Sequence, residues 1–120
     1  MIKNEIIIKY LKIDEVSKFP IEEIKKMMPT RFEMALKHKD ETSKLLSFAS
    51  IILMSKNMEF KEEDIFYNEY KKPMLKDIYF NLSHSGDYAI FVKDKLPIGV
   101  DIQIINKNNL DIKKNAFTKN

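Results

Sequence analysis

The chain has 120 residues, and its 21 lysines and arginines against 18 acidic residues give a formal net charge of only +3. The length suits one domain, and a hydrophobic content of 44% is sufficient for a core. The scattered lysines argue against nucleic-acid binding, and the lack of cysteine excludes disulfides and thiolate metal sites. The chain has no apolar run of membrane-spanning length and no secretory leader, so we expect a cytoplasmic protein with no membrane partner.

The first forty residues predict one strand and two short helices. Glu5–Ile13 is an apolar, β-branched run typical of a strand. Pro20, followed by two glutamates, favours the start of a short helix that ends before Pro29. Thr30 is then expected to cap a second helix from Arg31 to about His38.

The strongest helix signal follows Asp40, a residue type that is common at helix N-caps. Apolar residues recur with helical spacing after it, at Leu45, Leu46, Phe48, Ala49, Ile52 and Leu53. The pattern predicts a long helix from Asp40 to about Asn57.

The second half of the chain predicts strands. Ile65–Tyr70 is a short strand candidate that Lys71, Lys72 and Pro73 end. A period of two then predicts an antiparallel meander of Phe80–Ser83, Tyr88–Val92 and Leu96–Ile105, with turns at Ser85–Asp87 and Lys93–Lys95. The polar segment Asn106–Asn120 is expected to be a loosely held tail. We therefore predict an α/β (α+β) domain over residues 1–105, an antiparallel sheet packed on a long helix, followed by a tail over 106–120.

The last predicted strand carries a candidate metal site. Its apolar face would be Val100, Ile102 and Ile104, and its other face Gly99, Asp101 and Gln103. A carboxylate and an amide two residues apart offer the oxygen ligands that suit Mg²⁺. The alternative is the ordinary polar face of a half-exposed strand.

Two further segments could bind phosphate. Ser83 and His84 carry a hydroxyl and an imidazole beside a glycine turn, and both groups can hydrogen-bond a phosphate. The alternative is a hairpin turn with a solvated histidine. Lys71, Lys72 and Arg31 are cations that could also bind phosphate, although most such side chains are merely solvated.

These segments follow one another in the order of a known signature. Glu69–Pro73 reads EYKKP, Phe80–Asp87 reads FNLSHSGD, and Pro97–Gln103 reads PIGVDIQ. They resemble the EYGKP, FN-[LI]-SHSG and PIG-[VI]-DIE motifs of the Sfp-type 4'-phosphopantetheinyl transferases. The resemblance covers roughly residues 25 to 118, and it identifies the chain as the N-terminal half of such an enzyme. The family fold is a pseudo-dimer of two similar α/β halves.

The resemblance implies a function and a set of site residues. The family transfers 4'-phosphopantetheine from coenzyme A, its substrate, to a serine of an acyl or peptidyl carrier protein, with Mg²⁺. By position, Asp101 and His84 would be catalytic, and Asp101 with Gln103 would hold the metal. Coenzyme A would be bound by Arg31, Lys72, Ser83 and His84.

The sequence also departs from the family. Gln103 replaces a glutamate, and Lys71 replaces a glycine. The family's second half carries a tryptophan and a lysine–glutamate motif that have no counterpart here, although Ala116–Thr118 resembles the opening of that half. We expect an incomplete active site. Three accounts follow: a piece of a longer transferase, a half that self-associates into a homo-oligomer, or a non-catalytic module that binds coenzyme A or a carrier protein.

Overall fold

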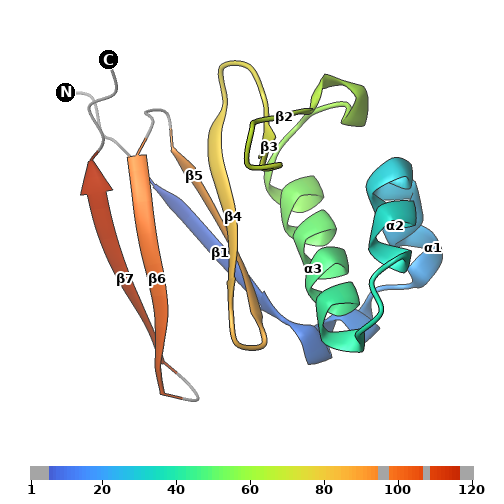
Figure 1. The fold of residues 1–120 in the computed structure, drawn as a ribbon, viewed down its shortest axis with the longest axis horizontal. Helices are drawn as coiled ribbons and strands as arrows, with labels where there is room; N and C mark the ends of the chain where they lie inside the picture. The colour runs from blue at the N-terminus through green and yellow to red at the C-terminus, as the bar shows by residue number, and fades with distance from the viewer. Residues whose placement is uncertain (1–5, 95–97, 107–108, 117–120) are drawn as a thin grey trace.

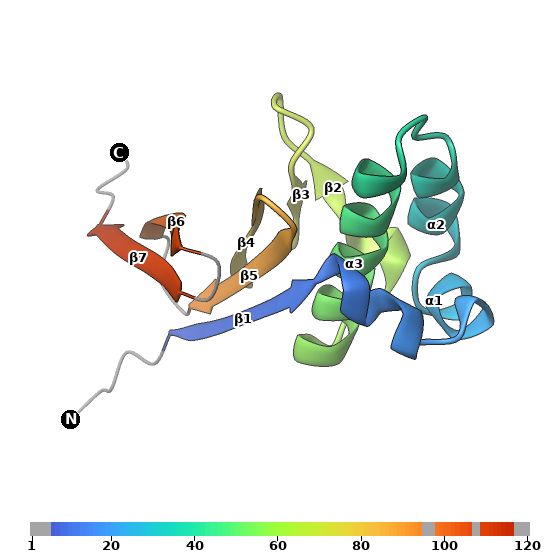
Figure 2. The ribbon, with the colours of Figure 1, turned by 90° about the horizontal axis from the view of Figure 1, so that it is seen from below.

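A computed structural model describes residues 6–94, 98–106 and 109–116, with side chains described for 6–94. The elements form three layers (Figures 1 and 2). A three-stranded antiparallel sheet lies in the middle, the α-helices cover one of its faces, and a β-hairpin lies on the side away from the helices. The chain is therefore an α+β fold, as the sequence predicts.

The central sheet contains β1 (Ile7–Lys12), β5 (Tyr88–Asp94) and β4 (Tyr79–Ser85), in the order β1-β5-β4. β4 and β5 form the expected hairpin, in which Ser85 pairs with Tyr88. Gly86, the first of the two turn residues, has φ 57°, a left-handed value that glycine adopts without a steric penalty. The turn is also fixed to the N-terminal strand, because the Ile13 N–H donates to the Asp87 carbonyl at 2.9 Å.

The helices are α1 (Ile21–Met27), α2 (Pro29–Leu36) and α3 (Glu41–Asn57), with 3₁₀ turns η1 (Ile13–Lys18) and η2 (Glu62–Asp64). The expected cap at Thr30 is wrong. α2 starts two residues earlier than predicted, at Pro29, with Met28 at the N-cap, because proline in the first turn lacks only an N–H that would have no helical partner there.

α3 begins directly after Asp40 and ends at Asn57. The Oδ2 atom of Asp40 accepts a hydrogen bond of 2.9 Å from the backbone N–H of Ser43. This backbone hydrogen bond, with a further one from the Ser43 side chain, lowers the pKa of Asp40 below its usual value. A charged N-cap therefore fixes the start of the longest helix.

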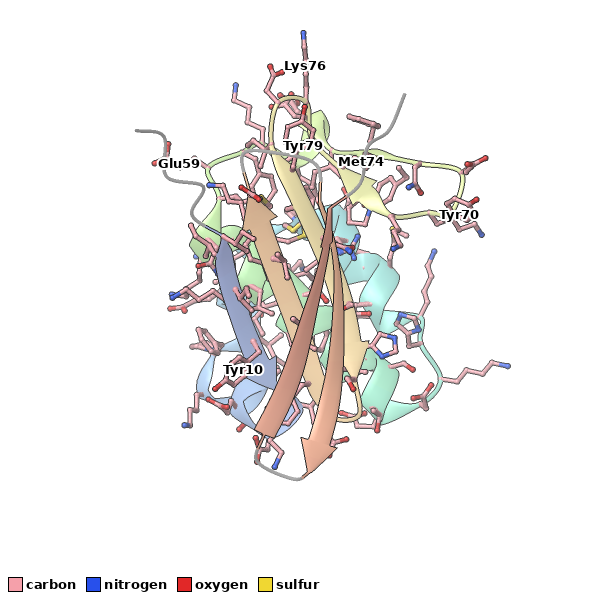
Figure 3. All side chains as sticks on the ribbon, turned by 90° about the vertical axis from the view of Figure 1, so that its left-hand side faces the viewer. Tyr10, Glu59, Tyr70, Met74, Lys76 and Tyr79 are labelled. Carbon is pink, nitrogen blue, oxygen red and sulfur yellow. The ribbon has the colours of Figure 1, made fainter. Side chains whose placement is uncertain are left out.

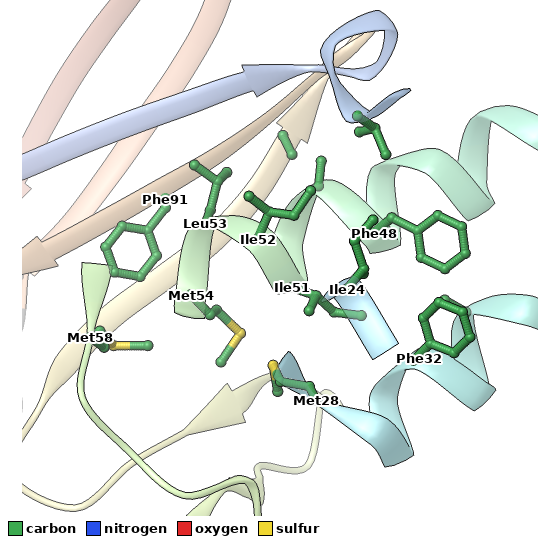
Figure 4. Close-up of a cluster of buried hydrophobic side chains, with 14 of the residues drawn as sticks. Ile24, Met28, Phe32, Phe48, Ile51, Ile52, Leu53, Met54, Met58 and Phe91 are labelled. Atoms are coloured by element: carbon green, nitrogen blue, oxygen red, sulfur yellow. The ribbon is translucent and has the colours of Figure 1, made fainter. Parts of the chain in front are cut away.

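The core lies between α3, the sheet and the two short helices (Figure 4). Phe91 of β5 is fully buried, and Phe32 of α2 stacks on Phe48 of α3 with ring centroids 5.2 Å apart. Ile51 and Met54 are also fully buried, although they lie off the apolar stripe that predicts the helix. They are covered because α3 is packed against the sheet and against α1 and α2.

The C-terminal strands differ from the prediction. β6 (Ile98–Asn106) pairs with β7 (Asn109–Ala116) and not with β5, so it is not the third strand of a meander. Both hydrogen-bonding edges of β5 are already taken, one by β4 and one by β1. The loose tail expected from Asn106 is wrong for Asn109–Ala116, since a short connection lets this segment complete a hairpin with β6.

Two smaller expectations are also corrected. The strand predicted at Ile65–Tyr70 is only β2 (Phe66–Tyr67), which pairs with β3 (Pro73–Met74). The turn predicted at Lys93–Lys95 begins later, because Lys93 and Asp94 belong to β5, and Lys95 lies outside the described residues. Within the described ranges, no helix has the length and apolar character needed to cross a membrane.

Candidate functional site

Ser83 and His84 lie in β4, at an edge of the central sheet as far as the structure describes it. In the strand register His84 pairs with Ala89 and Ser83 pairs with Ile90. Ala89 belongs to the core cluster under α3, so His84 is on the helix side of the sheet and Ser83 is on the other side. Both side chains are exposed. One ligand can contact both only at the strand edge.

Lys72 lies in the loop between β2 and β3, and its side chain is exposed. Asn68 holds this loop: its Oδ1 accepts from the backbone N–H of Tyr70 at 2.8 Å and from that of Lys72 at 3.0 Å. The preceding residue, Lys71, has φ 62°. Glycine, which the family motif has at the matching position, adopts such a value without a steric penalty. The bracing role of Asn68 was not predicted, although asparagine is common in such turns.

Arg31 is half-buried in the first turn of α2. Its guanidinium Nη1 donates to the Tyr67 hydroxyl at 3.3 Å, and its Nε is buried and has no hydrogen-bond partner within the described residues. The backbone N–H groups of Thr30 and Arg31 donate to the two carboxylate oxygens of Glu62, at 3.0 and 2.9 Å. The Glu62 carboxylate thus binds the backbone N–H groups at the start of α2. A phosphate could therefore contact Arg31 only through the guanidinium group of the arginine.

An open hollow lies beside this helix start. It is lined by Thr30, Lys61, Glu62, Glu63, Ile65 and Tyr67. Sequence reasoning missed Glu62 and Tyr67, because the contacts that bring them to α2 span about thirty residues of chain.

Asp101 and Gln103 lie two residues apart in β6, so their positions share one face of that strand. Their register partners in β7 are Lys113 and Asp111. The structure describes only the backbone of these strands. Among the residues searched, no three histidine, aspartate or glutamate side chains are grouped as a metal site would require.

The structure divides the candidate residues among three places. Arg31 and Lys72 are associated with the β2–β3 hairpin, which the Arg31–Tyr67 hydrogen bond ties to α2. Ser83 and His84 lie near the end of β4, while Asp101 and Gln103 belong to the hairpin in front of the sheet in Figure 3. Within the described residues, the candidates therefore lie in three separate places and are not gathered in one enclosed pocket.

Comparison with known proteins gives a consistent set of relatives. The chain is 33% identical to 4'-phosphopantetheinyl transferase Sfp of Bacillus subtilis over 89 residues, which is 68% of this chain and 40% of that protein. It is 33% identical to the B. subtilis transferase ffp over 90 residues, with 69% and 40% covered. The gsp transferase of Aneurinibacillus migulanus is 37% identical over 54 residues, with 44% and 23% covered.

The match covers only part of the length of each relative. This chain spans about two fifths of the length of the two B. subtilis transferases. No family model and no solved structure matches it. The chain is a relative of the Sfp-type 4'-phosphopantetheinyl transferases and corresponds to part of one.

Proposed function

We propose that this chain is the coenzyme A-binding half of a cytoplasmic, Mg²⁺-dependent 4'-phosphopantetheinyl transferase. One observation supports this proposal beyond the identity to known transferases. The two motif glycines of the family, in EYGKP and in SHSG, match Lys71 and Gly86, and both positions have left-handed backbones, with φ 62° and 57°. The family motifs thus match the local geometry as well as the sequence.

The proposed chemistry depends on cations and hydrogen-bond donors. In the transfer, the hydroxyl oxygen of a carrier-protein serine forms a bond to phosphorus, and the bond from that phosphorus to the adenosine 3',5'-bisphosphate leaving group breaks. The serine proton passes to a base that we assign to the part of the relatives that this chain does not match. Arg31, Lys72, Ser83 and His84 would bind the phosphates of coenzyme A and oppose the charge that grows on the leaving oxygen.

The residues of β6 fit a hard cation. Asp101 and Gln103 carry oxygen donors at positions that share a face of the strand, which is the donor type that Mg²⁺ takes. Bound Mg²⁺ would supply charge stabilisation at the phosphates. Because Gln103 is neutral, the pair carries one negative charge, which favours weak metal binding.

The histidine on the helix side of β4 provides a direct test. His84→Ala should weaken coenzyme A binding about tenfold, the loss expected for one charge-assisted contact. The chain has only two histidines, and the other, His38, is exposed in the turn between α2 and α3. His38→Ala is therefore the matched control and should leave affinity unchanged in calorimetric titration. Equal affinities for all three proteins would contradict a coenzyme A site at β4.

Self-association is a second part of the proposal. Large apolar side chains are exposed around the β2–β3 hairpin and the start of β4 (Figure 3). They are Phe66, Tyr67, Tyr70, Met74 and Tyr79. Apolar groups gathered in this way often mark an interface. The chain spans only two fifths of its relatives, and we propose that a second copy covers this surface in place of the part of the relatives that it does not match.

Light scattering tests the self-association directly. At about 50 µM, where contacts of micromolar affinity are populated, the chain should have the mass of a dimer or of a larger oligomer. Phe66→Asp should shift it toward the monomer, because the charge would be desolvated in the interface. A stable monomer of the unchanged chain at that concentration would refute the proposal.

The alternative is a non-catalytic module that binds coenzyme A or a carrier protein, and the neutral Gln103 favours it. A mass-shift assay on an acyl or peptidyl carrier protein separates the two. Transfer by the oligomer supports the enzyme, whereas coenzyme A binding without any transfer supports the module.

A further inference from the structure

Lys71 has an unfavourable backbone conformation. Its φ of 62° lies in the left-handed region, where the β-carbon of an L-residue is crowded against the following carbonyl. Within the described residues, the only other non-glycine residue with positive φ is Asp77. Aspartate tolerates this region better than most residues, since its short side chain can hydrogen-bond locally. Lysine has no such compensation.

The loop itself imposes this conformation. The Lys71 N–H donates to the Asn68 carbonyl at 2.9 Å, and the Asn68 N–H donates to the Lys72 carbonyl at 3.0 Å. The Asn68 side chain accepts from two further N–H groups of the same loop. A glycine at position 71 would allow the same hydrogen bonds at a lower conformational cost. A lysine there is therefore not explained by stability.

The charges around Lys71 indicate what its side chain could bind. Lys71 and Lys72 are consecutive and exposed, and neither forms an ion pair within the described part of the chain. Arg31 reaches the same hairpin through Tyr67, the register partner of Pro73. Glu62, the nearby acid on the Arg31 side, already accepts two backbone hydrogen bonds. Glu69 is exposed in the loop and offsets part of the positive charge.

We propose that Lys71 is a phosphate-binding residue, which adds a third cation to those of Lys72 and Arg31 at the β2–β3 hairpin. Its ligand is a phosphate group of a nucleotide-like polyanion. For coenzyme A, and on the proposed function above, this is either the 3'-phosphate or the pyrophosphate. The strained backbone is retained because the cation at this position contributes to binding.

The test compares binding with stability. Lys71→Gly removes both the charge and the strain, while Lys71→Asn removes the charge but keeps a residue that tolerates positive φ. Lys76→Ala removes an exposed lysine from the next turn and is the matched control. Each protein is titrated by calorimetry with coenzyme A, with dephospho-coenzyme A, which lacks the 3'-phosphate, and with inorganic pyrophosphate.

We expect both Lys71 variants to bind coenzyme A about threefold to fivefold more weakly than the unchanged chain. Lys71→Gly should at the same time raise Tm by about 3–6 °C, since the left-handed residue no longer has a β-carbon. A loss confined to coenzyme A identifies the 3'-phosphate as the ligand. A loss that extends to dephospho-coenzyme A and to pyrophosphate identifies the pyrophosphate.

Three outcomes would overturn the inference: unchanged affinities in both Lys71 variants, an equal loss in Lys76→Ala, or no binding of any of the three ligands by the unchanged chain. The proposed function fails separately. Pyrophosphate binding that depends on Lys71, without coenzyme A binding, would contradict the transferase and support the phosphate site. Coenzyme A binding that does not depend on Lys71 would support the proposed function and contradict the phosphate site at Lys71.

Discussion

Asp101→Ala should abolish the strengthening of coenzyme A binding by Mg²⁺. In the proposed site Asp101 is the only carboxylate on the motif strand, and without it Gln103 alone cannot attract a divalent cation. Gln103→Glu should have the opposite effect, because a second negative charge favours the cation. Calorimetric titration of coenzyme A with and without Mg²⁺ measures both changes. Binding should persist in the absence of Mg²⁺, since the proposed phosphate contacts lie elsewhere in the fold.

The control for this experiment is Asp14→Ala, which removes an exposed carboxylate from η1. Its Mg²⁺ response should equal that of the unchanged chain. On the proposed function, we also expect the monomeric chain to modify a carrier protein more slowly than a full-length relative by orders of magnitude, because the proposed base is assigned to no residue of this chain. A Mg²⁺ response that persists in Asp101→Ala, or rapid transfer by the monomer, would contradict the proposed site.

Phe91→Ala should have the largest effect on stability. The Phe91 side chain is fully buried between β5 and α3, and its ring stacks on Phe80 with centroids 6.1 Å apart. Truncation of such a side chain leaves a cavity and typically costs about 3–5 kcal/mol. A domain of this size has a total stability of about 5–15 kcal/mol, so the variant should lose a large part of its free energy of unfolding.

Met34→Ala is the control, because it removes a large apolar side chain at a position that is 52% exposed and lies outside the proposed interface. Urea unfolding followed by circular dichroism compares the two variants with the unchanged chain. We expect Met34→Ala to change the free energy of unfolding by less than about 1 kcal/mol. Equal losses in both variants would show that the core does not lie where the structure has it.

The sequence predicts those elements whose signals are local. The α3 helix could be read from its apolar spacing and from Asp40, and the β4–β5 hairpin from its alternation and from Gly86. The order of the strands could not be predicted, because the partner of β1 in the sheet is β5, which lies far from it in the sequence. The alternation that predicts β6 does not specify its partner, so the third strand of the meander was assigned wrongly.

The candidate site shows the same difference between local signals, which the sequence carries, and long-range contacts, which it does not. The motifs predict Lys72, Ser83 and His84 as coenzyme A contacts, and these roles stay predictions. The departure at Lys71 from the glycine of the family motif is visible in the sequence alone. The contacts that hold Arg31 could not be predicted. Glu62 accepts from the start of α2 only because the segment after α3 returns to that helix, and no local pattern encodes this return.

The pairing of β1 with β5 has a consequence for how the protein is made. Ile7 is the register partner of Lys93, so β1 has no partner in the central sheet until β5 has been synthesised. Closing so long a loop is entropically costly and slows the completion of the sheet. The helices can form earlier, because their contacts are local. Until β5 has been synthesised, β1 is an unpaired, largely apolar segment, and its charged residues, Lys9 and Lys12, disfavour pairing with other chains.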